Sequence, residues 1–174
     1  DQIPDGSGSL VSISNLEHAE NLLDKDYGNY ATYVGGLGVA NNLAIAGVQR
    51  TDGLMFDGTA DQQGAVNVGF VVESDNEVID AKVLEFFQIR CYKDNKEVYR
   101  HVISESNAIG AGVGTSTKTQ KVRFSIRVEP IDKDAKPIQF DQIVLWKSGV
   151  LDLGLSKLKL YYAFMEDSNS PCAN

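Results

Sequence analysis

The chain has 174 residues, of which 43% are hydrophobic, and its 16 Lys and Arg against 24 Asp and Glu give a formal net charge of −8. A chain of this length suits one domain whose core forms without metal ions or disulfides. The acidic balance repels phosphate backbones, so we expect no nucleic-acid partner. The apolar runs fall far short of the roughly 18 residues that a membrane-spanning helix needs, so we expect no direct membrane span.

The two ends of the chain differ in composition from its middle. Residues 1–11 begin with the polar, glycine-containing stretch DQIPDGSGS, which is typical of a flexible lead between an export signal or lipid anchor and a folded domain. Residues 167–174 form a polar C-terminal tail. We therefore expect residues 12–166 to fold as one domain.

The first element expected is a short N-terminal helix. Ser14 and Glu17 have the spacing of a capping box, and apolar residues then recur near helical spacing until Asp24. A turn should follow, because Asp24 begins the stretch DKDYGN, which contains residues typical of turns.

This turn is also the candidate metal site. Asp24 and Asp26 alternate, Gly28 permits backbone carbonyls to point inward, and Asn29 adds an amide oxygen, which are the hard oxygen ligands that Ca²⁺ prefers. The 12-residue spacing of an EF-hand is absent. The alternative is a helix-ending turn in which the Asp side chains accept hydrogen bonds from local N–H groups.

Three tyrosines adjoin this turn and are candidates for ligand binding. An aromatic face complements the apolar C–H patches of a sugar ring, so Tyr27 and Tyr30, with Asn29 between them, are the predicted ligand-binding residues. Tyr30 and Tyr33 have opposite phases on the strand that follows, so at least one of them should belong to the core.

Alternating apolar and polar residues then predict about eight strands. They lie in the stretches 30–34, 43–50, 65–73, 86–93, 96–103, 121–129, 138–146 and 157–164. The stretch 93–96 between two of them predicts a hairpin. Both phases of 138–146 are largely apolar, which favours a central strand. The sequence therefore predicts an all-β fold, an antiparallel β-sandwich.

The alternation also predicts which side chains face the core. In three strands the inward set is Val66, Val68, Phe70 and Val72; Val122, Phe124, Ile126 and Val128; and Leu158, Leu160, Tyr162 and Phe164. Outward phases are expected for Tyr99, Tyr161 and Met165. Arg123 and Arg127 should form a basic stripe on the outer face.

The two cysteines leave three interpretations open. Cys91 has an apolar phase and Cys172 lies in the polar tail, so Cys91 is either a small buried hydrophobe or the partner of Cys172 in a disulfide. Metal binding is the least favoured reading, because no CxxC or Cys/His cluster exists.

Catalysis lacks a recognisable set of residues. The only histidines are His18, on the predicted helix, and His101, on an outward phase, and no nucleophile motif accompanies either of them. The glycine runs GGLGVAN and GAGVGTST lack the third glycine of a dinucleotide fingerprint and the lysine of a P-loop, respectively. We therefore expect no enzyme.

Two segments carry a family resemblance. NLEHAENLLDKDYGNYATYVGGLGV resembles the opening of secreted jelly-roll modules on the surfaces of Bacteroidetes-type bacteria, and FDQIVLWKSGVLDLGLSKLKLYYAFME is similar to their closing part. The opening also resembles, more remotely, discoidin or coagulation factor 5/8 type C domains, which are galactose-binding-like. Asp24 and Asp26 match the acidic pair of that family, whereas Lys25 stands where the family has Gly.

The resemblance implies a jelly-roll-like sandwich that is secreted or displayed on the bacterial outer surface. We expect a non-catalytic binding or adhesion module, whose partner is an extracellular glycan or protein contacted through loops at one end of the sandwich. The alternative is a structural or accessory subunit in an assembly with other surface proteins.

Overall fold

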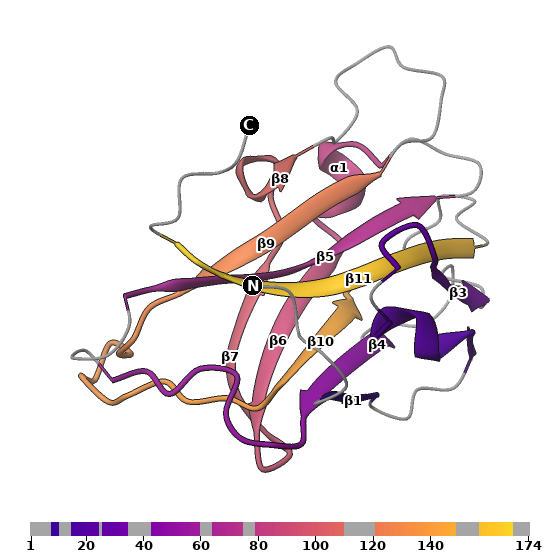
Figure 1. Ribbon diagram of the computed structural model, residues 1–174. Helices are drawn as coiled ribbons and strands as arrows, with labels where there is room; N and C mark the ends of the chain where they lie inside the picture. The colour runs from indigo at the N-terminus through magenta and orange to yellow at the C-terminus, as the bar shows by residue number, and fades with distance from the viewer. Residues whose placement is uncertain are drawn as a thin grey trace.

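The computed structural model describes residues 8–10, 15–24, 26–34, 43–59, 64–74, 79–109, 121–148 and 157–168. Two antiparallel sheets pack face to face (Figure 1). The five-stranded sheet has the order β1 (Gly8–Leu10), β4 (Leu43–Arg50), β10 (Gln142–Lys147), β6 (Phe87–Lys93) and β7 (Lys96–Val102). The six-stranded sheet has the order β2 (Leu16–Glu17), β3 (Ala31–Val34), β11 (Lys157–Asp167), β5 (Val66–Ser74), β9 (Val122–Val128) and β8 (Ala108–Ile109).

The strand order is that of a jelly roll. When only the eight strands of four or more residues are counted in chain order, one sheet reads first, eighth, third, sixth and the other reads second, seventh, fourth, fifth. Strands far apart in sequence are therefore neighbours, as two interleaved Greek keys require. The predicted all-β antiparallel sandwich is confirmed. The strands β1, β2 and β8, of two or three residues each, are additional to those expected.

The core lies between the sheets and consists of the predicted alternating residues. Every second residue of β5 and β9 is buried there, namely Val66, Val68, Phe70, Val72, Val122, Phe124, Ile126 and Val128. Phe87 of β6 stacks on Phe124 across the core, with ring centroids 6.1 Å apart. This contact joins the two sheets, because β6 and β9 belong to different ones.

The predicted hairpin and central strand are present. Asp94 and Asn95 both have positive φ, of 50° and 61°, at the β6–β7 turn. Two consecutive left-handed residues form the turn that suits the twist of a hairpin, and Asp and Asn tolerate that conformation. β10 lies in the middle of its sheet between β4 and β6, as its two apolar faces predicted.

The N-terminal helix is shorter and of a different type than the capping box predicted. It is a single 3₁₀ turn, Ala19–Leu22, whose N-cap is His18 in a left-handed conformation without a side-chain cap. Leu16 and Glu17, which the capping box assigns to the start of a helix, instead form β2 and pair with β3. Ser14 lies outside the described residues. A short α-helix, α1 (Ala81–Leu84), precedes β6 and is capped by the side chain of Asp80.

A β-bulge in β11 reverses part of the predicted inward and outward positions of its side chains. The register against β5 shifts between Leu160 and Tyr162. Leu158 and Leu160 face the core as expected. After the bulge the phase is reversed, so Ala163 faces the core, whereas Tyr162 and Phe164 join a separate outer cluster. A bulge adds one residue to one strand and thereby exchanges the two faces beyond it.

Two further outward assignments are wrong for similar reasons. Met165 follows the bulge and packs against the main core. Tyr99 also packs against this core, where the β6–β7 register shifts between Cys91 and Tyr92. Its hydroxyl donates to the carbonyl oxygen of Arg127 in the other sheet at 3.2 Å.

Cys91 is buried in the core, as its phase predicted. Burial raises the pKa of its thiol far above the usual value. Cys172 lies outside the described residues, so the alternative of a disulfide between Cys91 and Cys172 is not tested. No helix among the described residues is long and apolar enough to cross a membrane.

Candidate functional site

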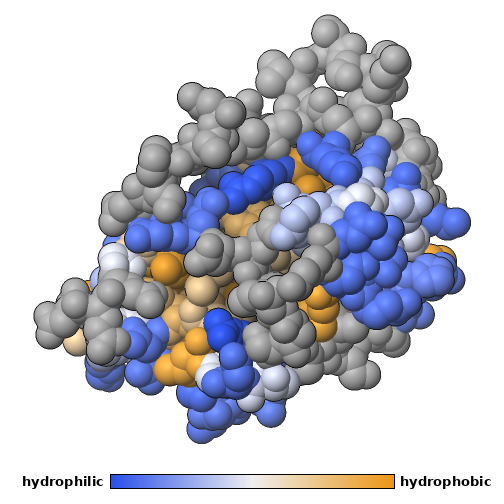
Figure 2. All heavy atoms as spheres, viewed as in Figure 1, coloured by the Kyte–Doolittle hydropathy of each residue, from blue (hydrophilic) through white to orange (hydrophobic). Residues whose placement is uncertain are grey.

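The candidate site is a cluster of tyrosines on the outer face of the six-stranded sheet. Tyr27 and Tyr30 come from the loop before β3, and Tyr161 and Tyr162 come from the bulge of β11. These four residues are called the tyrosine cluster below. Figure 2 shows one face of the molecule, on which hydrophilic side chains alternate with apolar surface.

The four rings form two edge-to-face pairs. Tyr27 meets Tyr162 with ring centroids 5.2 Å apart at 65°, and Tyr30 meets Tyr161 at 5.5 Å and 60°. Such geometry is the favoured one for aromatic pairs. Tyr161 is buried, whereas Tyr27 is 48% and Tyr30 39% exposed. The buried ring of Tyr161 and the half-buried ring of Tyr162 therefore support the two exposed rings.

Charged side chains hold the loop on the sheet. The Lys121 ammonium lies 3.6 Å from the ring centroid of Tyr161 and donates to the carbonyl oxygen of Tyr27 at 3.4 Å. The Tyr161 hydroxyl donates to Glu73 at 2.5 Å. The Lys159 ammonium lies 5.2 Å from the ring centroid of Tyr30. Cations over aromatic faces are attracted to the ring electrons, so these contacts orient the rings.

A second aromatic group continues this surface along β11. Phe164 lies 6.5 Å from Tyr162, measured between ring centroids, and the Arg123 guanidinium covers its ring at 3.7 Å. Arg123 also forms an ion pair of 2.7 Å with Glu166. The predicted outward position of Arg123 is thus observed, and its charge is matched by Glu166.

The two carboxylates predicted to bind metal make local hydrogen bonds. Asp24 accepts from the backbone N–H of Asp26 at 3.0 Å and from the Asn29 amide at 3.1 Å. Asp26 accepts from the backbone N–H of Gly28 at 2.8 Å. These contacts are those of the turn interpretation. They fix the loop that carries Tyr27 and Tyr30.

The described residues contain no group of three or more His, Cys, Asp and Glu side chains arranged to hold a metal ion. The calcium site at Asp24 and Asp26 stays a prediction. Asn29 is exposed beside Tyr30, and its amide nitrogen is directed to Asp24. It therefore contributes to the turn as well as to the rim of the tyrosine cluster.

Both histidines lie at exposed positions. His18 forms a 3.6 Å contact with Glu20 beside the 3₁₀ turn, and His101 lies on β7. His18 lies beside the six-stranded sheet and His101 lies in the five-stranded sheet, so the two side chains do not come together. The charged side chains recorded in contact with the tyrosine cluster are those of Lys121, Lys159 and Glu73.

The exposed half of the cluster is predictable from the sequence, whereas part of its support is not. Tyr27 and Tyr30 were predicted as ligand-binding residues, Tyr33 is the core member of the pair with opposite phases, and Tyr161 faces outward as expected. Tyr162 was assigned to the core, and Lys121 was not singled out. The two consecutive tyrosines of β11 are the signal that the sequence offers for this cluster, since regular alternation turns at least one of them outward.

The comparisons with known proteins give one structural likeness. No family model matches the chain, and no curated protein matches it. Among solved structures, the chain is similar to a Streptococcus pneumoniae fucose binding module, with a TM-score of 0.41 and 14% sequence identity over 95% of this chain and 97% of that one. At this TM-score and identity the likeness does not carry the ligand of that module over to this chain.

Proposed function

We propose that this chain is a non-catalytic, extracellular binding module that takes up glycans through the tyrosine cluster. The observation that carries the proposal is that the side chains of Tyr27 and Tyr30 are exposed while the rings of Tyr162 and Tyr161 pack against them. A sugar ring presents an apolar C–H face that complements an aromatic face, and a fixed ring loses little conformational entropy on binding.

Polar groups at the rim suit the hydroxyls of a sugar. Asn29 lies between the two exposed tyrosines, and Lys121, Lys159 and Glu73 lie beneath and beside them. An apolar platform with a few polar groups around it is the usual composition of a small-ligand site. The bacterial outer surface as the location, and the Bacteroidetes-type origin, stay predictions from the sequence.

The test is a glycan array followed by calorimetry on the full chain and on Tyr27→Ala and Tyr30→Ala. We expect at least one glycan to bind and each substitution to weaken its affinity roughly tenfold, or about 1.4 kcal/mol. Ile131→Ala is the matched control, because Ile131 is comparably exposed and belongs to a different loop. Equal loss in the control, or no binding to any glycan, would contradict the proposal.

A second candidate function is that of a subunit in a surface assembly. β7 is the last strand in the order of its sheet, and every residue of it except Tyr99 is exposed. Val98 and Val102 expose 41% and 44% of their surface. An edge strand of this kind can add a strand from a partner.

This second candidate is tested by light scattering of the chain across a concentration series and by Val98→Lys. Assembly through β7 predicts a mass above that of a monomer that returns to the monomer value in the variant. A monomer at every concentration, with glycan binding intact, would leave only the first function.

A further inference from the structure

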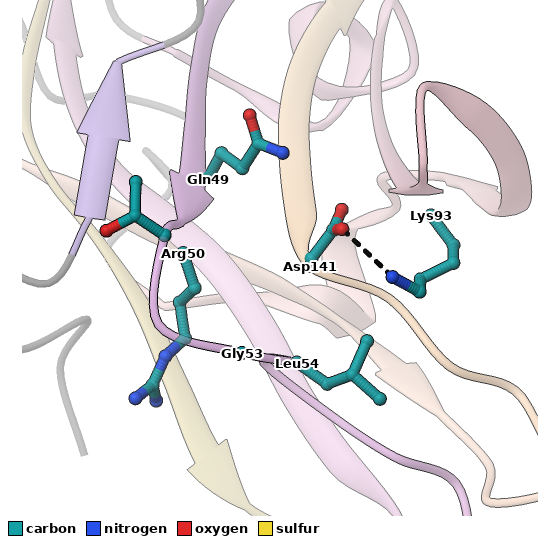
Figure 3. A pocket seen from close by; sticks show the side chains of 7 residues that line it. Gln49, Arg50, Gly53, Leu54, Lys93 and Asp141 are labelled. Carbon is teal, nitrogen blue, oxygen red and sulfur yellow. Dashed lines mark hydrogen bonds and ion pairs between the residues drawn. The ribbon is translucent and has the colours of Figure 1, made fainter.

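A polar recess of about 390 Å³ lies at one end of the five-stranded sheet, where β4 ends and β10 begins (Figure 3). Its volume is within the range of about 300–1,000 Å³ that is usual for small-ligand sites. It is lined by Gln49, Arg50, Thr51, Gly53, Leu54, Lys93 and Asp141. None of these residues belongs to the tyrosine cluster, which is built on the other sheet.

The backbone holds the centre of the recess rigidly. The N–H of Asp141 donates to the carbonyl oxygen of Tyr92 at 3.0 Å, and the N–H of Arg50 donates to that of Asp141 at 2.8 Å. Asp141 is thus fixed between the ends of β4 and β6. A site on rigid elements keeps its geometry when a ligand binds.

The carboxylate of Asp141 is only partly satisfied. Asp141 is 8% exposed, and its Oδ1 atom has no hydrogen-bond partner among the described residues. Its Oδ2 atom accepts from Lys93 at 3.3 Å, a long contact. A buried acceptor without a donor costs about 1–3 kcal/mol, so such groups normally have a partner. The Asp141 carboxylate can therefore accept a further hydrogen bond.

Lys93 can release Asp141 without becoming unpaired. Its ammonium also lies 3.1 Å from Asp94 in the adjoining hairpin turn. The hydrogen bond to Asp94 and the one to Asp141 both raise the pKa of Lys93, so the side chain stays charged at neutral pH. A rotation of the Lys93 side chain toward Asp94 would free Oδ2 of Asp141 from its contact with the ammonium.

The other charges of the recess are already matched. The Arg50 guanidinium donates twice to Asp52, at 2.8 Å each, and Figure 3 shows it directed away from Asp141. A free anion would meet the carboxylates of Asp141 and Asp52, and a free cation would meet Lys93. A hydroxyl group both donates and accepts, so it suits this mixed lining better than either ion.

Figure 3 shows the Asp141 carboxylate between the Gln49 amide and the Lys93 ammonium, with the Leu54 side chain nearby. We propose that this recess is a second binding site, which takes one residue of a neutral sugar. Its hydroxyls donate to Asp141 and accept from Lys93 and the Gln49 amide, while Leu54 contacts a C–H face of the ring. The proposal is independent of the tyrosine cluster, since it rests on the opposite sheet.

The test is a titration of the ¹⁵N-labelled full chain with neutral monosaccharides, namely D-galactose, D-glucose, D-mannose, L-fucose and N-acetyl-D-glucosamine, to about 20 mM, well above a Kd of about 1 mM. We expect at least one sugar to shift the backbone amides of Arg50, Lys93 and Asp141. The Tyr27→Ala and Tyr30→Ala variants should show the same shifts, which separates this site from the tyrosine cluster.

Two variants and two further probes complete the test. Asp141→Asn should weaken the affinity measured from these shifts at least tenfold, and Gln49→Ala should do so if Asp141→Asn does not fold. Glu85→Gln, at an exposed position away from the recess, should leave the affinity unchanged. D-glucuronate and methylamine should shift these amides less than the neutral sugar. The proposal is overturned by absence of shifts with every neutral sugar, by unchanged affinity in the folded variants, or by a stronger response to either charged probe.

Discussion

The ring of Phe164 lies directly over Gly69 on the neighbouring strand. The two residues are paired across β11 and β5, and a Cβ atom at Gly69 would lie 2.6 Å from Cζ of Phe164 and still closer to the carbonyl oxygen of Phe124. Glycine is therefore required at this position, because it leaves the space that the ring occupies. This pair anchors the part of β11 that follows the bulge.

Gly69→Ala should destabilise the fold. The added methyl group meets backbone on one side and an aromatic ring on the other, so overpacking should lower the free energy of unfolding by about 1–3 kcal/mol. Chemical denaturation measures this directly. Ser125→Ala is the matched control, since Ser125 pairs with Gly69 from the other side and loses only a hydroxyl. Equal stability of Gly69→Ala and the wild type would contradict the packing described.

The ion pair of Arg123 and Glu166 should contribute a measurable coupling. The two side chains are 30% and 28% exposed, and the contact of 2.7 Å is reinforced by the Phe164 ring beneath Arg123. A double-mutant cycle with Arg123→Ala and Glu166→Ala should give about 0.5–1 kcal/mol, decreasing with added salt. A coupling of zero at low salt would show that the pair does not hold β9 to β11.

Asp132 should make stability depend on pH in acid. It accepts from the backbone N–H groups of Lys136 at 2.9 Å and Asp134 at 2.8 Å, and these bonds lower the pKa of its carboxyl. The stabilisation is therefore fully present above the unfolded pKa of about 3.9 and is lost as pH falls through the folded value. Carbon-detected NMR titration should give a pKa below 3.9, and Asp132→Asn should remove this part of the pH dependence.

Calcium distinguishes the two interpretations of Asp24 and Asp26. If the turn binds Ca²⁺, added CaCl₂ raises the Tm of the wild type but not that of Asp24→Ala or Asp26→Ala. If the carboxylates serve only the turn, CaCl₂ leaves the wild type unchanged, and both variants lose stability to the same extent with and without the ion. Thermal unfolding with MgCl₂ as the control ion separates these outcomes.

The sequence predicts where the strands lie better than it predicts which side chains of each strand face the core. All eight predicted strands exist, because alternation over five or more residues is a strong local signal. The reversal of Tyr162 and Phe164 was not predictable, since a bulge depends on the register against β5, which is distant in sequence. Both phases of YYAF are apolar or aromatic, so the alternation itself does not reveal where the phase changes.

The candidate site likewise contains residues that the local sequence indicates and residues that only the fold brings together. Tyr27 and Tyr30 could be found from their place beside a turn, whereas Lys121, nearly 100 residues away, joins them only through the folded sheets. The recess around Asp141 was missed altogether. Its residues come from the ends of β4 and β6, from the loop after β4 and from the position before β10. A single Asp beside a strand carries no sign that one of its oxygens lacks a partner.

The most direct test of the central claim is a crystal structure of the chain with the glycan that binds most tightly on the array. We expect a sugar ring stacked on Tyr27 or Tyr30, with ring carbons about 4 Å from the aromatic carbons. A glycan that touches neither tyrosine, with both rings still facing solvent, would contradict it.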